Sequence, residues 1–286
     1  MINYSFVIPH KNDIESLKRC VNSIPERNDV EIVVVDDCSN EKPVLSRKGL
    51  KIIYLKKSHG AGYARNIGLD NIAGKWVLFA DCDDFYEKDF LTELDKWVDK
   101  DLDIVYFDVH FRYKISSKSE HYFMKSAYDR WVLGDHSYQS EIDVKHGYNV
   151  PWNKMTRLEY VKKIFARFEE IPVGNDALFV HQCAAQTHRI DVINHQLYYY
   201  VDNECGLTRK KHTYESIRAL FKSTVRVNRI KAKAGAWKQI MLPWFDFPKY
   251  YRMFGFWKTL RLYIEKIICD VNPCILIYKK MKLRNK

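Results

Sequence analysis

The chain has 286 residues, of which 47% are apolar and 14% aromatic, which excludes a disordered chain and allows a large buried core. Its net charge of +11 lies wholly in residues 226–286, which hold 15 Lys or Arg and 3 Asp or Glu. Seven scattered cysteines without a CxxC pair argue against a disulfide framework or zinc site and favour a reducing cytosol. Because no apolar run approaches about 18 residues and no charged segment precedes an apolar one at the N-terminus, we expect neither a membrane-spanning helix nor a signal peptide.

The first hundred residues alternate between predicted strands and predicted helices. The strands are short apolar or β-rich runs, at Tyr4–Pro9, Glu31–Val35, Lys51–Leu55 and Trp76–Phe79. Asp13 is expected to cap a helix after the first strand, and a second helix is expected from about Ala61 to Ile72. This alternation predicts an α/β fold with a Rossmann-like, mostly parallel sheet flanked by helices.

Polar residues follow the predicted strands at their C-terminal ends, where open α/β sheets bind ligands. Asp36-Asp37 follows the second strand, and the acidic stretch Asp81–Asp84 follows the fourth. Crowded carboxylates repel one another, and a divalent cation shared with substrate phosphates relieves that repulsion. Arg65 lies about one helical turn after a Gly-rich turn, where a guanidinium can bind phosphate. Each feature alone is consistent with solvated surface residues, but together they predict a nucleotide-diphosphate site.

Four motifs, in the order IPHKND, EIVVVDDCSNE, GAGYARNIGL and GKWVLFADCDDFYEKDFL, resemble those of the GT-A glycosyltransferases of family 2. That family typically has IPxYN, VDDxS, GxxxARNxG and a DxD-type acidic motif. The resemblance covers about residues 3–100 in detail and continues more weakly through PWNKMTRLEYVKK, NDALF and LYYYVDNECGLT. These later segments are similar to those of enzymes that build bacterial surface polysaccharides. The resemblance implies a GT-A fold and transfer of a sugar from a nucleotide-diphosphate sugar, with UDP as the expected nucleotide.

The resemblance also implies donor-side roles for the matching positions. Asp37 would contact the nucleotide base, Arg65 would lie near the pyrophosphate, and Asp81 would lie near the ribose or the metal. Asp83, together with Asp81, would hold Mn²⁺ or Mg²⁺ between the diphosphate oxygens. The implied nucleotide-sugar site comprises Pro9, Lys11, Asp37, Arg65, Asp81 and Cys82. Three positions depart from the family pattern, with Lys11 in place of a base-stacking Tyr, Ser58 in place of Asn, and Asn175 in place of Glu.

Asp176 has two interpretations at this stage. It precedes a predicted helix at Ala177–Gln186, and as an N-cap its replacement by Ala would cost ~1 kcal/mol. The match to the family implies instead that Asp176 is the base that deprotonates the acceptor hydroxyl. One base and one metal-bound leaving group imply an inverting single displacement without a covalent intermediate. Asp84 is a less favoured base, and Trp152 and Asn153 are expected to contact the acceptor.

Three parts are expected along the chain. Residues 1–100 form the nucleotide-sugar-binding half of the GT-A domain, residues 101–225 its acceptor-binding half, and residues 226–286 a basic, aromatic, helical C-terminal extension. Residues 112–150 suit loops over a cleft. Alternating aromatic and basic residues in the extension favour an anionic membrane surface, and packing on the catalytic domain is the alternative. No nucleic-acid-binding module is recognisable, so no nucleic-acid partner is expected.

The sequence thus predicts a metal-dependent, inverting glycosyltransferase that uses Mn²⁺ or Mg²⁺ and acts on a glycan or lipid-linked oligosaccharide acceptor. We expect it in the cytoplasm, peripheral to the inner face of the cell membrane. A sugar-1-phosphate nucleotidyltransferase would need a Gly-rich, Arg-containing loop directly after the first strand, and residues 9–12 (PHKN) are not such a loop. A sugar-nucleotide or glycan binding module without turnover is the non-enzyme alternative.

Overall fold

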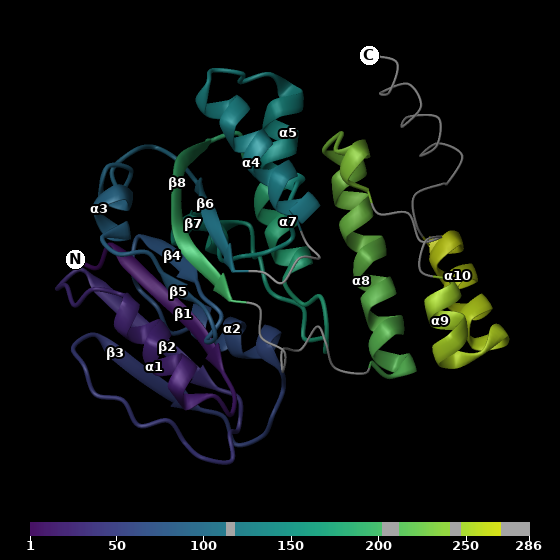
Figure 1. Cartoon of the computed structure of the whole chain (residues 1–286), viewed down its shortest axis with the longest axis horizontal. Coiled ribbons are helices and arrows are strands. Elements are labelled where there is room, and N and C mark those ends of the chain that lie inside the picture. Colours follow the sequence, from purple (N-terminus) through teal and green to yellow (C-terminus); the bar gives the residue numbers. More distant parts are fainter. Residues whose placement is uncertain (113–117, 202–211, 241–246, 270–286) are drawn as a thin grey trace.

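The computed structural model describes residues 1–112, 118–201, 212–240 and 247–269 (Figure 1). The strands are β1 (Tyr4–His10), β2 (Val30–Asp36), β3 (Leu50–Tyr54), β4 (Trp76–Phe79), β5 (Phe85–Tyr86), β6 (Ile104–Arg112), β7 (Lys154–Arg157) and β8 (Ile190–Val201). The α-helices are α1 (Ile14–Ser23), α2 (Ala61–Leu69), α3 (Phe90–Asp95), α4 (Lys118–Val132), α5 (Tyr138–His146), α6 (Leu158–Lys163), α7 (Ala177–Ala185), α8 (Tyr214–Lys233), α9 (Phe247–Phe254) and α10 (Phe256–Cys269). A short 3₁₀ helix, η2 (Trp237–Gln239), follows α8.

The strands form one sheet in the order β3-β2-β1-β4-β7-β6-β8-β5. Strands β3, β2, β1 and β4 are parallel, so the carboxyl ends of β1, β2 and β4 meet at one edge. Beyond β4 the sheet is mixed, because β7 is antiparallel to both β4 and β6, and β5 is antiparallel to β8. The predicted α/β fold is confirmed. The sequence pattern does not predict β7, because four residues are too few to show a strand period.

The predicted strand Trp76–Phe79 is confirmed as β4, and all four of its side chains are buried. Helix α2 packs closely on the neighbouring strand β1 through a glycine. A Cβ atom on Gly68 would lie only 2.3 Å from Cγ1 of Val7, so no larger residue fits there without a shift. This close approach fixes α2 against the sheet edge that carries the acidic residues.

The expectation of loops in residues 112–150 is wrong, since α4 and α5 lie there. The helical signal was present, because Met124, Ala127, Tyr128 and Trp131 follow helical spacing and are all buried. On α5, Nδ1 of His146 lies 2.9 Å from Nδ1 of His181 on α7. Burial and nearby lysines lower the pKa of His146 to about 3, so this ring stays neutral and helps to join the two helices.

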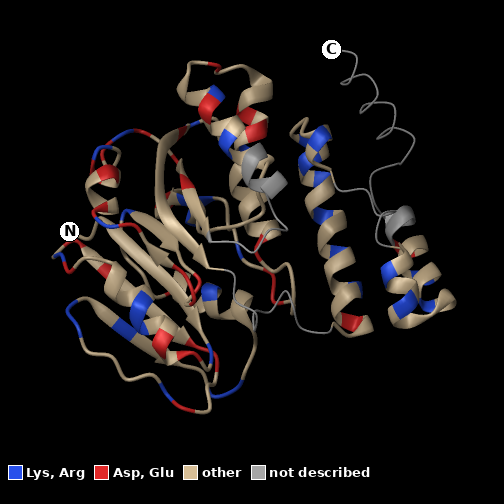
Figure 2. Cartoon of the chain, viewed as in Figure 1, with Lys and Arg blue, Asp and Glu red and all other residues tan. Residues whose placement is uncertain are grey.

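Helices α8, α9 and α10 form a second hydrophobic cluster, built from Ile217, Phe221, Tyr250, Leu262 and Tyr263. Figure 1 shows α8 between α7 and the α9–α10 pair, and α8 contacts both α7 and α10. The predicted boundary between residues 225 and 226 falls inside α8, and the division into three parts stays a prediction. Within the described ranges, no helix combines the length and the apolar composition needed to span a membrane. Lys and Arg residues recur along α8 and also occur in α9 and α10 (Figure 2).

Candidate active site

Two residues of α2, Gly62 and Asn66, hold the segment that leads into α7. A Cβ on Gly62 would lie 2.0 Å from the carbonyl oxygen of Glu169, so only glycine permits this approach. The amide of Asn66 pairs with the backbone of Phe168, donating to its carbonyl at 3.0 Å and accepting from its N–H at 2.9 Å. The motif GAGYARNIGL therefore builds a platform for the segment that ends at Asp176.

Arg65 joins the acidic stretch after β4 to the segment that precedes α7. Its guanidinium donates to Oδ1 of Asp81 at 2.5 Å and to Oδ1 of Asn175 at 2.7 Å. The guanidinium carbon also lies 5.4 Å from the ring centre of Phe168, and Arg65 is only 5% exposed. Two of the predicted site residues, Arg65 and Asp81, are thus brought together by a contact that the sequence does not predict. Asn175, which the sequence marks only as a departure from the family, supplies the amide oxygen that completes the bridge.

The acidic stretch after β4 divides into two partly exposed carboxylates and one buried one. The side chain of Asp81 is 33% exposed, and Asp83 is also partly exposed. Asp84 is fully buried, and it accepts hydrogen bonds from the Tyr198 hydroxyl and the Val201 N–H, each at 2.7 Å. Burial and the neighbouring Asp81 and Asp83 raise the pKa of Asp84 well above its usual range. Asp84 therefore anchors the stretch to β8.

Asp81 and Asp83 suit a metal ion whose remaining ligands come from a bound substrate. Within the described residues, no group of three or more His, Cys, Asp and Glu side chains could hold a metal ion on its own. Mg²⁺ is commonly held by one or two carboxylates together with substrate phosphates, and two partly exposed carboxylates match that pattern. The two acids therefore fit a cation that arrives with a diphosphate.

Asp37 organises the loop before α2. Its carboxylate accepts hydrogen bonds from the Ser58 hydroxyl at 2.6 Å, from the His59 N–H at 2.6 Å and from the Gly60 N–H at 3.0 Å. Nζ of Lys11 donates to the same Ser58 hydroxyl at 2.5 Å and lies 3.6 Å from Oδ2 of Asp37. Lys11 and Ser58 are two of the three positions that depart from the family pattern. In the structure both side chains lie against the carboxylate of Asp37.

The remaining donor-side positions lie close to these residues. Pro9 is buried in β1 opposite Val35 of β2. Burial and the neighbouring Asp83 and Asp81 raise the pKa of the Cys82 thiol, which is hydrogen-bonded to the backbone of Lys11. Lys11 therefore connects the end of β2 with the end of β4, as expected for a loop that follows the strand between them.

Asp176 sits at the start of α7 next to the bridging Asn175. Asp176 occupies the N-cap position of α7, but within the described part of the chain its carboxylate makes no capping hydrogen bond there, so the position alone does not decide between a cap and a base. Burial raises the pKa of Asp176, the positive charge of Arg65 opposes that rise, and Asp81 adds to it. Lys154 lies near the same carboxyl, and burial lowers the pKa of Lys154 to about 7. The sequence motif includes this lysine but does not indicate its burial.

Trp152 and Asn153 lie in the interior of the structure. Trp152 is 4% exposed and stacks on Tyr198, with ring centres 5.3 Å apart. Asn153 has no exposed surface, and its amide donates to the Tyr128 hydroxyl at 2.8 Å. Their burial favours a role in holding β8 and α4 over direct contact with an acceptor, which stays an untested prediction.

The parallel strands that end in carboxylates and the arginine bridge to the acceptor-side segment define a GT-A glycosyltransferase fold. The family model described as glycosyl transferase family 2 matches residues 5–165, which is more than half of the chain. The chain belongs to this family of sugar-transferring enzymes.

The relatives are bacterial glycosyltransferases. The chain is 25% identical to the Staphylococcus aureus poly(ribitol-phosphate) beta-N-acetylglucosaminyltransferase TarS over 218 residues, which cover 72% of this chain and 36% of TarS. It is likewise 25% identical to the Streptococcus pneumoniae glycosyltransferase GlyA over 220 residues, covering 71% of this chain and 31% of GlyA. The chain therefore spans about a third of the length of these relatives.

A solved structure supports the fold. The crystal structure of S. aureus TarS 1–349 in complex with UDP-GlcNAc matches with a TM-score of 0.65 at 18% identity. The match covers 93% of this chain and 80% of that one. At this identity, the likeness establishes the GT-A fold.

Replacing Tyr198 by Phe should destabilise the acidic stretch specifically. The hydroxyl of Tyr198 donates to Asp84 and accepts from the Asp81 N–H at 3.1 Å, so its loss leaves buried polar groups unpaired. We expect the free energy of unfolding to fall by about 1–3 kcal/mol, measured by chemical denaturation of the full chain. Tyr199→Phe is the matched control, because its hydroxyl donates to the partly exposed Glu87. Equal losses in the two variants would contradict the anchoring role of Asp84.

Proposed function

We propose that this chain is a metal-dependent, inverting glycosyltransferase that takes a sugar from a UDP-linked donor in bacterial surface polysaccharide synthesis. The observation that carries the proposal is the Arg65 bridge from Asp81, in the acidic motif, to Asn175, next to Asp176. TarS, which was solved with UDP-GlcNAc, supports UDP as the donor nucleotide. The acceptor is a glycan or a lipid-linked oligosaccharide.

On the donor side, the base end and the diphosphate end have separate binding residues. Asp37 and Lys11 form a polar cluster at the end of β2 that suits the nucleotide base, and Asp81 and Asp83 would hold Mn²⁺ or Mg²⁺ against the diphosphate. The bound cation would neutralise charge on the leaving diphosphate. Arg65 adds a fixed positive charge beside Asp81, which stabilises the same leaving group without reorganisation.

On the acceptor side, Asp176 removes the proton from the attacking hydroxyl. The oxygen then bonds to the anomeric carbon as the bond to the diphosphate breaks on the opposite face, so the configuration inverts in one displacement. A base must be deprotonated to act, and the raised pKa of Asp176 moves it toward the operating pH, where a base is most effective. Arg65 limits that rise and keeps the carboxyl ionisable.

A panel of nucleotide sugars tests the donor and the metal together. Wild-type protein should hydrolyse one donor slowly in Mn²⁺ without acceptor, should lose the activity in EDTA, and should favour a UDP sugar. Asp83→Ala should lower the rate about a hundredfold or more, because charge on the leaving group is then poorly neutralised. Asp99→Ala, which removes an acid from an exposed pair with Lys75, should leave the rate unchanged. Donor binding by calorimetry without any turnover would favour the binding-module alternative, and failure to bind UDP would contradict the nucleotide site.

Asp176→Asn tests the base while it preserves the shape of the side chain. The rate of transfer should fall by about 10²–10⁴-fold with little change in donor affinity, because only proton removal is lost. In the wild type, the rate should rise with pH through the raised pKa of Asp176, since the carboxylate form is the base. In Asp176→Asn that rise should vanish. Glu170→Gln, an exposed acid on the same segment, is the control. An unchanged pH profile in Asp176→Asn would show that another group is the base.

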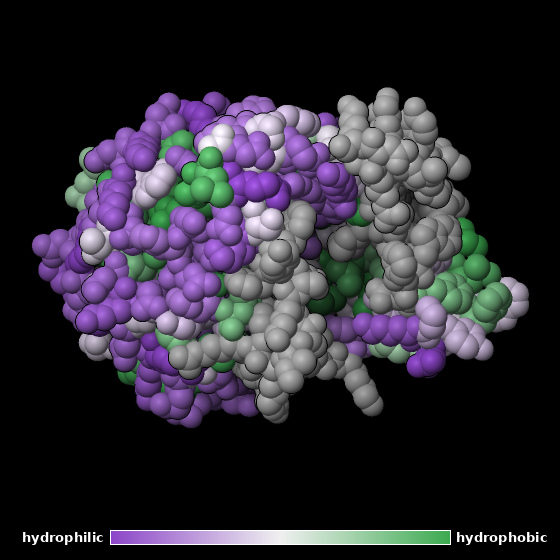
Figure 3. All heavy atoms as spheres, turned by 45° about the horizontal axis from the view of Figure 1, so that its top comes forward, coloured by the Kyte–Doolittle hydropathy of each residue, from purple (hydrophilic) through white to green (hydrophobic). Residues whose placement is uncertain are grey.

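We also propose that α9 and α10 hold the protein at an anionic membrane surface on the cytoplasmic side. The exposed hydrophobic side chains of these helices are Tyr251, Met253, Phe256, Trp257 and Ile264. Trp257 is 78% exposed, and Figure 3 shows the hydrophobic surface at the end of the molecule where α9 and α10 lie. Exposed Lys and Arg side chains flank it (Lys249, Arg252, Lys258 and Arg261). Aromatic side chains beside cations suit anionic headgroups.

Co-sedimentation with vesicles tests this surface. The full chain should bind vesicles that contain phosphatidylglycerol and should bind pure phosphatidylcholine vesicles weakly. Tyr251→Ser combined with Trp257→Ser should reduce binding to the anionic vesicles by roughly tenfold, because two aromatic anchors are lost. Leu133→Ser, which changes an 87% exposed leucine next to α4, should not change binding. Equal losses in both variants would rule out α9 and α10 as the contact.

A further inference from the structure

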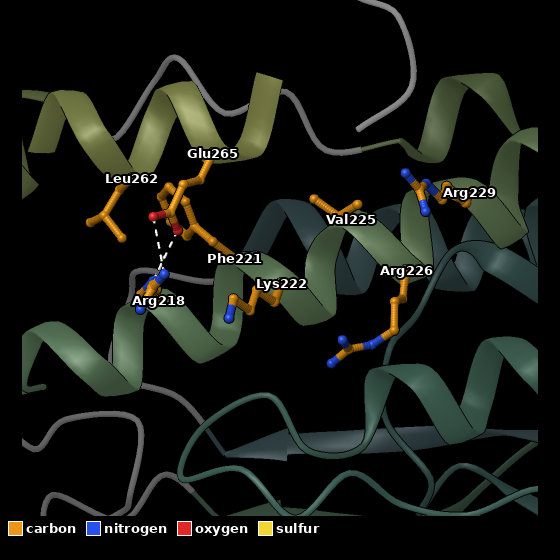
Figure 4. Close-up of a pocket in the computed structure, with 8 residues that line it drawn as sticks. All are labelled: Arg218, Phe221, Lys222, Val225, Arg226, Arg229, Leu262 and Glu265. Atoms are coloured by element: carbon orange, nitrogen blue, oxygen red, sulfur yellow. Dashed lines mark hydrogen bonds and ion pairs between the residues drawn. The ribbon is translucent and has the colours of Figure 1, made fainter. Parts of the chain in front are cut away.

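A cleft of about 420 Å³ lies between α8 and α10 (Figure 4). Its lining residues are Arg218, Phe221, Lys222, Val225, Arg226, Arg229, Leu262 and Glu265. The site residues described above do not line it. The cleft is therefore distinct from the candidate active site.

The walls of the cleft are hydrocarbon. Phe221 and Val225 reach up from α8, and Leu262 faces them from α10 (Figure 4). Each of these side chains is less than a tenth exposed, so the walls are largely shielded from water. Such a surface favours an apolar chain over a solvated polymer.

The rim of the cleft is positively charged. Arg218, Lys222, Arg226 and Arg229 follow one another at intervals of three or four residues along one side of α8. Glu265 is the only acid among the lining residues, and it is already bound by Arg218 at 2.9 and 3.1 Å and by Arg261 at 3.0 Å. Four cations and one acid thus line the cleft, a net charge of +3 among the lining residues, and this cationic excess suits a phosphate.

The cleft is connected to the base through a short series of contacts. Arg226 lines the cleft and also pairs with Glu169, which accepts a hydrogen bond from Ser223 as well. The N–H of Glu169 donates to the carbonyl of Asn175 at 3.0 Å, and Asp176 follows Asn175 in the chain. Arg226 therefore links the cleft to the segment that ends at the proposed base.

We propose that the cleft between α8 and α10 binds the lipid phosphate of a lipid-linked acceptor. The hydrocarbon chain lies on Phe221, Val225 and Leu262, and the phosphate lies on Lys222 and the neighbouring arginines. The inference rests on the proposed function, because it names the lipid-bearing class of acceptor for the same enzyme.

Vesicle binding by the full chain tests the site. The probe is a polyprenyl phosphate in phosphatidylcholine vesicles, compared with vesicles that carry the same charge as phosphatidylglycerol. The wild type should bind the polyprenyl phosphate vesicles about tenfold more tightly than the phosphatidylglycerol vesicles. The double variant Lys222→Gln with Arg229→Gln should remove that preference, because each cation near a lipid phosphate contributes to binding. Val225→Phe should remove it too, because the larger ring fills the cleft without a change in charge.

The control removes the same charge away from the cleft. Lys233 and Lys238 are exposed and do not line it, so Lys233→Gln with Lys238→Gln should keep the preference. Three results would overturn the proposal: equal binding of the wild type to the two kinds of vesicle, a preference unaffected by the two cleft variants, or an equal loss in the control. Competition by inorganic phosphate alone at the same concentration would also overturn it, since the hydrocarbon chain would then be irrelevant.

Donor hydrolysis by the wild type, which requires no lipid, separates this inference from the proposed function. Hydrolysis of a donor without a preference for polyprenyl phosphate would remove the cleft assignment alone. A preference for polyprenyl phosphate without hydrolysis or binding of any donor would remove the proposed function and leave a lipid phosphate site.

Discussion

The buried guanidinium of Arg65 is the interaction on which the rest of the site depends. A charge that is 5% exposed must be paired, and Asp81 and Asn175 supply the partners from two distant parts of the chain. The Asn175 contact closes a separation of 110 residues. Gly62 makes it possible, because its missing side chain lets the segment from Glu169 approach α2. One buried charge thus fixes the segment before α7 against the acidic stretch that follows β4.

Helix α8 extends this arrangement to the C-terminal helices. It touches α7 on one side and α10 on the other, and Ser223 and Arg226 reach back to Glu169. Its inward residues therefore support the acceptor-side segment, while its other side forms the cleft. The basic residues begin partway along α8, which spans Tyr214–Lys233. The change in charge therefore does not coincide with the end of a structural element, and the boundary of the expected extension cannot be placed from charge alone.

The sequence predicts the parts of the site that lie close together in the chain. The α2 motif and the acidic stretch after β4 carry their own local signals, and the parallel order of β1, β2 and β4 brings them to one edge. Contacts made across long separations could not be predicted. The anchoring of Asp84 depends on Tyr198, 114 residues away, and the role of Asn175 depends on the depth at which Arg65 is buried. In residues 112–150, abundant His and Tyr obscured a helical period that was present.

The shared arginine also has a thermodynamic consequence. Asp81 bonds to Arg65, and the same carboxylate is a proposed metal ligand, so cation binding and the Arg65–Asp81 bond draw on one group. A bound donor that changed the strength of the hydrogen bond from Arg65 to Asn175 would be coupled to the segment before α7. By linkage, that segment would change the donor affinity by the same free energy. In the proposed enzyme, donor binding and the position of the segment that ends at Asp176 would therefore be coupled through Arg65.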